Sequence, residues 1–195
     1  MSKIFLGEPP ANIKAWIVEH YAPAPVGNPK TVITFTDNTT QEFNWSGTIT
    51  RQTMIDSGLM DEIDEIWIKK PIAVEISKTV TSIGDWAFCG CNTLTSVTIL
   101  DSITSIGYNA FSGCSSLTNI TLSSNLASIE QWAFSNCTNL TSITIPSRVE
   151  NIYPEAFFGC SALTSVTFQG KTLAQVQAMT DYPWAIKDTS IINVA

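Results

Sequence analysis

Thr-Ser-Ile-Gly-Asp-Trp-Ala-Phe at residues 81–88 is the stretch that decides the fold, because the chain repeats it. It returns as Thr-Ser-Ile-Gly-Tyr-Asn-Ala-Phe at 104–111, as Ala-Ser-Ile-Glu-Gln-Trp-Ala-Phe at 127–134 and as Glu-Asn-Ile-Tyr-Pro-Glu-Ala-Phe at 150–157. Successive copies follow a 23-residue period with no insertion. A fixed period of this length is typical of a solenoid, in which each coil packs only on its neighbours.

Eight positions keep their character in all four copies. In the first copy they are Val80, Ile83, Ala87, Phe88, Cys91, Leu94, Val97 and Ile99. Ser96 and Thr98 alternate with the apolar Val97 and Ile99, and this alternation predicts a half-buried strand. Because a single copy has no partner against which to bury these side chains, stacking on neighbouring copies must stabilise it.

This pattern resembles the BspA-type leucine-rich repeats, also called the Treponema pallidum type. Residues 80–170 follow that repeat nearly throughout, although only Pro146 keeps its usual proline, and Glu130 and Tyr153 replace its glycine. The resemblance implies a right-handed solenoid with parallel strands on one face. It also implies surface-displayed proteins that bind other proteins or cells, and it supplies no catalytic residues.

We therefore predict an α/β-type leucine-rich-repeat solenoid over residues 63–170, built from 23-residue coils. Its four full repeats are 80–102, 103–125, 126–148 and 149–171. Val74 and Ile76 lie one repeat period before Val97 and Ile99, so a degenerate first coil is expected to precede the full repeats.

The two ends of the chain do not follow the repeat pattern. Residues 1–62 predict a small α+β domain, with a helix at 11–21, a hairpin from 31–36 and 40–45, and a short helix at 50–59. Residues 171–195 predict a C-terminal cap with a short amphipathic helix containing Leu173, Val176 and Met179. Such caps cover the apolar edges of the outermost coils.

Charge and hydropathy exclude several classes of function. The formal net charge is −7 and only 14% of residues are charged, which disfavours nucleic acids and anionic membranes as partners. No apolar run approaches the roughly 20 residues that a membrane span needs. The first ten residues do not have the pattern of a secretory signal.

The five cysteines do not indicate a disulfide framework. Cys91, Cys114, Cys137 and Cys160 occupy one column, which predicts a buried ladder with a spacing of about 5 Å. A straight line of thiols cannot form a tetrahedral metal site, so neither a metal nor a cofactor is predicted. Cys89 lies outside the column, and we expect it to be the reactive thiol.

Two further groups invite a chemical interpretation. His20 is the only histidine, and without a nucleophile motif to pair with it we favour packing or surface exposure over catalysis. The acidic residues Asp61, Glu62, Asp64 and Glu65 lack the alternating ligands of a calcium loop. They predict a solvated surface.

Two sets of residues are expected to face outward. The first consists of the strand positions Thr98, Thr121, Thr144 and Thr167, with Ser96, Asn119, Ser142 and Ser165 beside them. A polar ladder of this kind is a soluble strand surface and needs no ligand. The second set is aromatic: Trp86, Tyr108, Trp132 and Phe158. Trp86 and Trp132 share a column two coils apart, roughly 10 Å by strand spacing. These four residues either pack on the coils or anchor a ligand.

The sequence thus favours a non-enzymatic recognition or adhesion module that binds a protein or glycan through its solenoid. The alternative is a structural or receptor-binding component of a larger assembly, such as a phage virion or tail fibre, docked or self-assembled through its N-terminal domain. Neither hypothesis involves a nucleic acid or insertion into a membrane. The family resemblance implies a location on a cell surface or a virion, and it leaves the ligand and the oligomeric state open.

Overall fold

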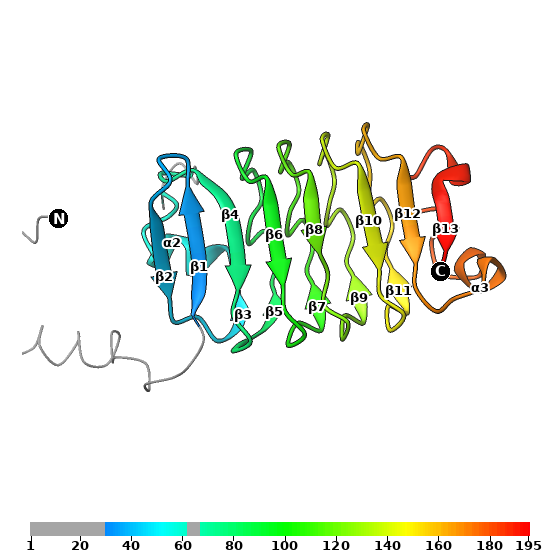
Figure 1. Ribbon diagram of the computed structural model, residues 1–195, viewed down its shortest axis with the longest axis horizontal. Coiled ribbons are helices and arrows are strands. Elements are labelled where there is room, and N and C mark those ends of the chain that lie inside the picture. Colours follow the sequence, from blue (N-terminus) through cyan, green and yellow to red (C-terminus); the bar gives the residue numbers. More distant parts are fainter. Residues whose placement is uncertain (1–29, 62–66) are drawn as a thin grey trace, which may run out of the picture.

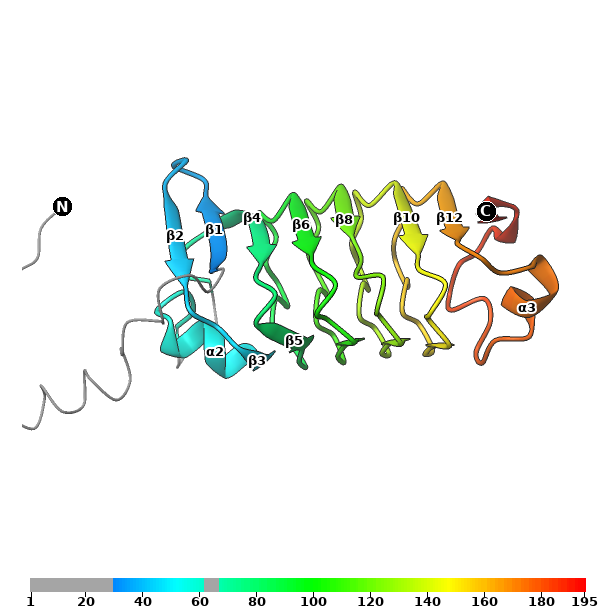
Figure 2. The same cartoon turned by 60° about the horizontal axis from the view of Figure 1, so that its bottom comes forward.

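The structure, a computed structural model, describes residues 30–61 and 67–195. The chain winds into an elongated parallel-strand solenoid whose coils follow one another from β4 to β12 (Figure 1). This confirms the predicted solenoid. Figure 2 shows that each coil is a narrow loop with strands on opposite sides.

The longer strands form one row along the solenoid. They are β4 (Pro71–Ile76), β6 (Ser96–Ile99), β8 (Asn119–Thr121), β10 (Ser142–Ile145) and β12 (Ser165–Phe168). β4 pairs with β6 in parallel, with Val74 opposite Val97, and β10 pairs with β12 with Ile143 opposite Val166. The register between neighbouring coils is therefore the repeat offset seen in the sequence. It also places Val74 and Ile76 in the core columns predicted for a degenerate first coil.

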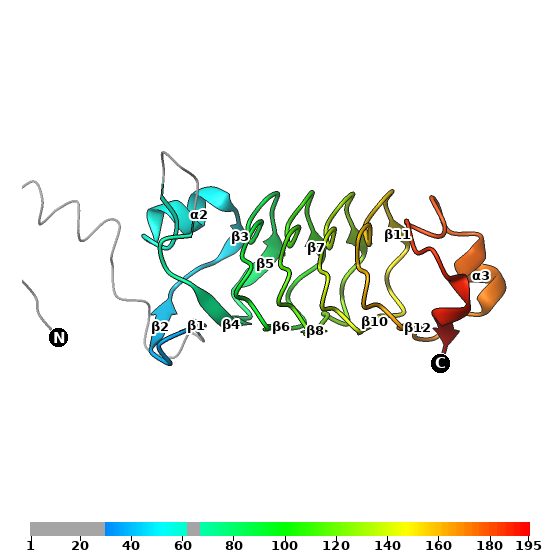
Figure 3. The same cartoon turned by 90° about the horizontal axis from the view of Figure 1, so that it is seen from above.

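A second row of parallel strands lies on the other side of the coils, as the view from above shows (Figure 3). It consists of β3 (Gly47–Ile49), β5 (Val80–Ile83), β7 (Ser105–Ile106), β9 (Ser128–Ile129) and β11 (Asn151–Ile152). The prediction of parallel strands on one face was therefore wrong, because they line two. The Ser-Ile pairs are extended because each isoleucine is fully buried while the main chain bonds to neighbouring coils. Thr104 N, for example, donates to Thr81 O of the preceding coil at 3.0 Å.

Residues 30–61 continue both rows. β1 (Thr31–Phe35) and β2 (Thr40–Phe43) form the predicted hairpin, and β1 also pairs with β4 in an antiparallel direction. α2 (Arg51–Asp56) begins after the N-cap Thr50, whose side chain accepts a hydrogen bond from Thr53 N. The helix predicted at 11–21 lies outside the described residues, as does the segment 62–66 that contains the predicted domain boundary. That boundary stays a prediction.

The C-terminal residues replace a further coil. α3 (Leu173–Gln177) is shorter than the predicted helix, and η1 (Thr189–Ile191) leads into β13 (Ile192–Val194), which pairs with β12 in parallel. Trp184 is buried and its ring lies 5.5 Å from that of Phe168. Its carbonyl accepts a hydrogen bond from Phe157 N at 3.2 Å, a role that the next coil performs elsewhere.

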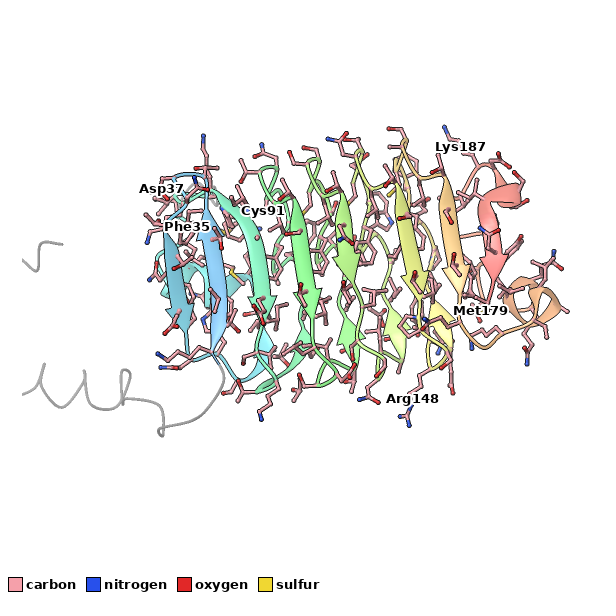
Figure 4. All side chains as sticks on the ribbon, viewed as in Figure 1. Phe35, Asp37, Cys91, Arg148, Met179 and Lys187 are labelled. Carbon is pink, nitrogen blue, oxygen red and sulfur yellow. The ribbon has the colours of Figure 1, made fainter. Side chains whose placement is uncertain are left out.

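The core is built from ladders of identical side chains. The rings of Phe88, Phe111, Phe134 and Phe157 stack with centroids 5.2, 5.5 and 5.8 Å apart and with interplanar angles of 5° or less. Beside them run the four predicted cysteines, of which Cys91, at a turn before β6, is labelled in Figure 4. The thiol of Cys114 donates to Phe88 O at 3.2 Å, and Cys137 and Cys160 repeat this bond one and two coils further on.

Candidate functional site

The turns that follow the second row of strands carry the four predicted aromatic residues. Each turn bonds to the next through its main chain: Trp86 N donates to Tyr108 O at 2.9 Å, Phe88 N to Ala110 O at 2.8 Å and Gly90 N to Ser112 O at 2.8 Å. These bonds run from coil to coil and hold the turns in line. We call Trp86, Tyr108, Trp132 and Phe158 the aromatic ledge.

The ledge tryptophans have an unusual backbone. Trp86 has φ 59° and Trp132 has φ 63°, both in the left-handed region, and Asn109 and Glu155 repeat this conformation in the other two coils. Asparagine suits the left-handed region, whereas a bulky side chain is destabilised there by about 1–2 kcal/mol. The repeat geometry thus requires a left-handed residue at this position, and the chain places tryptophan there twice.

The structure brings the four residues together as two pairs. The rings of Trp86 and Tyr108 meet edge to face with centroids 5.5 Å apart, and those of Trp132 and Phe158 lie 6.3 Å apart at 29°. Trp86, Tyr108 and Phe158 are exposed, while Trp132 is half-buried. The ledge therefore consists of two aromatic platforms in line along the solenoid, one on the first two full coils and one on the last two.

Trp132 carries an unsatisfied donor. Its indole Nε1 is buried and has no hydrogen-bond partner among the described residues. Burying a donor without an acceptor costs about 1–3 kcal/mol. Together with the left-handed backbone, this makes Trp132 a residue that costs stability where it stands, which is typical of functional positions.

Sequence reasoning missed a fifth exposed aromatic residue on these turns. Tyr153 is 38% exposed and occupies the position at which the first two full coils have Gly84 and Gly107. A side chain at Gly107 would collide with the main chain of Gly84 and Asp85, within 2.8 Å. The replacement of this glycine by tyrosine in the fourth coil was the signal in the sequence.

The polar side chains of the four turns that carry the ledge are neutral or acidic. The turn segments 84–90, 107–113, 130–136 and 153–159 contain no lysine or arginine and three carboxylates, at Asp85, Glu130 and Glu155. Asp85 Oδ1 accepts a hydrogen bond from Tyr108 N at 2.8 Å, and Glu130 accepts one from Ser128 Oγ at 3.2 Å. These turns can therefore accept hydrogen bonds from a ligand and contribute no positive charge of their own.

The cysteines are poor nucleophiles in this setting. Burial raises the pKa of Cys91 and of Cys160 to about 12, and it raises the pKa of Cys114 and Cys137 strongly as well. Burial also raises the pKa of Cys89, although nearby Arg51 opposes the shift. Because the thiolate is the reactive form, this direction disfavours the predicted reactivity of Cys89, which is half-buried.

The remaining predicted groups do not add to the ledge. Thr98, Thr121 and Thr144 are exposed on the long strands, as expected, whereas Thr167 on β12 is half-buried. His20, Glu62, Asp64 and Glu65 lie outside the described residues. Within residues 30–61 and 67–195, no group of three or more His, Cys, Asp or Glu side chains is placed to hold a metal ion.

Two hollows are lined by none of the four ledge residues. One, of about 220 Å³, separates the last coil from the C-terminal cap and is lined by Cys160, Leu163, Ile186 and Lys187 among others. The other, of about 350 Å³, lies beside Trp67, whose indole donates to Cys89 O at 3.0 Å. Among the helices of the described residues, none is long and apolar enough to cross a membrane.

Fold and turn geometry together define a leucine-rich-repeat solenoid. Residues 69–180, more than half of the chain, match the BspA type leucine rich repeat region in six copies, so the chain belongs to this family. The match extends beyond the four full repeats at both ends. A search of the curated proteins gives no match.

Nine chains of solved structures are similar. A leucine rich cell surface protein from Faecalibacterium prausnitzii A2-165 is 28% identical, with a TM-score of 0.53 over 56% of this chain and 35% of that one. This chain therefore spans about a third of that protein's length. The leucine rich repeat protein of T. pallidum is 22% identical, with a TM-score of 0.51 over 84% of this chain and 78% of the other, and it shares the fold alone.

Proposed function

We propose that the chain is a non-enzymatic recognition or adhesion module, and that the aromatic ledge is its contact surface for a protein or glycan. The observation that carries this proposal is the position of Trp86 and Trp132 in left-handed backbone, with Trp86 exposed beside Tyr108. Exposed tryptophan and tyrosine are typical anchors of binding interfaces. Strain at such anchors favours a functional interpretation over a packing one.

The comparisons favour recognition at a cell surface over a virion component. The family consists of repeat proteins, and the similar protein from Faecalibacterium prausnitzii is a cell surface protein. The described strands of the longer row offer no comparable anchors, because their outward side chains are mainly threonine, serine and asparagine. The ledge therefore supports recognition better than that strand face does.

Surface plasmon resonance on immobilised matrix proteins and polysaccharides tests the proposal. The chain should bind at least one surface, and Trp86→Ala with Trp132→Ala should weaken binding on the order of a hundredfold, since each anchor is worth at least ~1–2 kcal/mol. The matched control is Thr121→Ala with Thr144→Ala, two exposed positions on the long strands, which should bind like the wild type.

Two results would contradict the proposal. Equal binding by the wild type and the double tryptophan variant would exclude the ledge as the contact surface. Failure of the folded wild type to bind any protein or polysaccharide would count against a recognition module altogether. Circular dichroism and thermal unfolding of each variant distinguish lost binding from lost folding.

A further inference from the structure

The two platforms follow one another along the axis of the solenoid at a fixed spacing. Trp86 and Trp132 occupy the same position in coils two apart, and the phenylalanine ladder gives a coil-to-coil distance of 5.2–5.5 Å over this stretch. The platforms therefore lie roughly 10 Å apart, as strand spacing also requires. A ligand that contacts both must present the same apolar surface twice at this interval.

The apolar surface is divided rather than continuous. The Trp86–Tyr108 platform lies on the first two turns and the Trp132–Phe158 platform on the next two. The polar Glu130 and Gln131 precede Trp132 on its own turn, and among the described residues no ring contact joins the two pairs. Protein interfaces concentrate their anchors in one central, desolvated cluster. Two separate platforms with polar groups beside them suit a ligand that alternates apolar and hydroxylated surfaces.

The polar groups narrow the chemistry further. Asp85 and Glu130 provide acceptors for hydroxyl groups, and the absence of lysine and arginine from the four turn segments disfavours sulfated or acidic polymers. The apolar C–H face of a sugar ring stacks on an aromatic side chain, while its edge hydroxyls donate to such acceptors. In an extended β-1,4-linked glycan, alternate sugars present the same face at an interval close to two coils.

Resting on the proposed function, we infer that the ledge binds an unbranched, uncharged β-linked polysaccharide that lies along the solenoid, with one sugar stacked on each aromatic platform. Both platforms contact the same polysaccharide chain. Binding at the second platform is therefore effectively intramolecular and raises the affinity without a second ligand. A disaccharide can reach only one platform at a time, whereas a hexasaccharide reaches both.

Isothermal titration calorimetry with cellohexaose and chitohexaose tests this inference, with cellobiose and the α-linked maltohexaose as controls. One of the two β-linked hexasaccharides should bind, and the matching disaccharide and maltohexaose should bind far more weakly. Trp86→Ala and Trp132→Ala should each lower the affinity for the hexasaccharide by about tenfold or more, a loss typical of a lost anchor. Thr121→Ala with Thr144→Ala should leave it unchanged.

The outcomes separate this inference from the proposed function. One outcome is that neither hexasaccharide binds, while a matrix protein binds the wild type but not the double tryptophan variant. In that case the ledge recognises protein and the glycan inference is wrong. If a hexasaccharide binds equally well to the wild type and to both single variants, the ledge is not its site. A tighter response to a polyanion such as heparin would overturn the assignment to uncharged glycans.

Discussion

Two sets of aromatic side chains run along neighbouring positions of the same coils. The rings of Phe88, Phe111, Phe134 and Phe157 are buried and almost parallel, with one member in every full coil. The ledge rings are exposed or half-buried, pair in twos and meet at 61° and 29°. The repeated ladder stabilises the solenoid. The ledge, in which Trp86 and Trp132 occupy the left-handed position of the repeat, is where recognition is proposed.

The largest expected effect comes from the ladder. Phe111→Ala should lower the free energy of unfolding by about 3–5 kcal/mol, because it leaves a cavity between two stacked rings. Phe158→Ala is the matched control on the ledge, where loss of an exposed ring should cost no more than about 1.5 kcal/mol. Urea unfolding measures both. Equal losses of unfolding free energy in the two variants would contradict the distinction between the buried ladder and the ledge.

An effect that is smaller for each pH unit concerns the thiols beside the ladder. Their pKa in the folded chain is about 12 for Cys91 and Cys160, against an ordinary value of 9.0. Below pH 9 both states hold the proton, whereas between pH 9 and 12 only the folded chain does, so stability should fall as the pH rises through this window. The slope is at most about 1.4 kcal/mol per pH unit for each thiol.

Urea midpoints measured below and above pH 9 test this dependence. Replacing Cys91 and Cys160 together by alanine should flatten the alkaline decline relative to the wild type. If stability falls equally with pH in the two proteins, the ladder thiols are not desolvated. The contrast between a buried ladder and a solvent-exposed ledge would then be weaker.

The smallest effect isolates the strain in the ledge. At Trp132, glycine should be more stable than alanine by about 1 kcal/mol, because glycine adopts a positive φ without a steric penalty. At Phe158, whose backbone is not in the left-handed region, the usual order should hold and alanine should be the more stable. Thermal unfolding of the four variants measures this order of stability. A higher melting temperature for the alanine variant than for the glycine variant at Trp132 would mean that the ledge backbone is unstrained.

Much of the fold follows from the repeat itself. Residues that recur once in every period must stack, so Val97, Ile99 and Cys114 could be placed in ladders without a structure. The second row of strands was missed because its strands are only two residues long from β7 onward and show no alternation. β13 was missed since it belongs to no repeat copy.

The ledge was only half predictable. Its four members could be named because aromatic residues stand out at variable positions, but their pairing could not. Trp86 meets Tyr108 at a sequence offset shorter than the repeat period, and Trp132 meets Phe158 at a longer one. Since neither offset equals the period, a comparison of columns does not reveal the pairs. The left-handed backbone was equally hidden, because tryptophan does not suggest it.

The main-chain bonds between successive turns have a mechanical consequence. Bonds such as Phe88 N to Ala110 O point along the long axis of the solenoid. A pulling force applied between the two ends would load these bonds along their own direction, one coil after another, rather than shearing many at once. We expect the chain to yield by peeling, releasing one coil at a time, roughly 76–83 Å of extended chain for each.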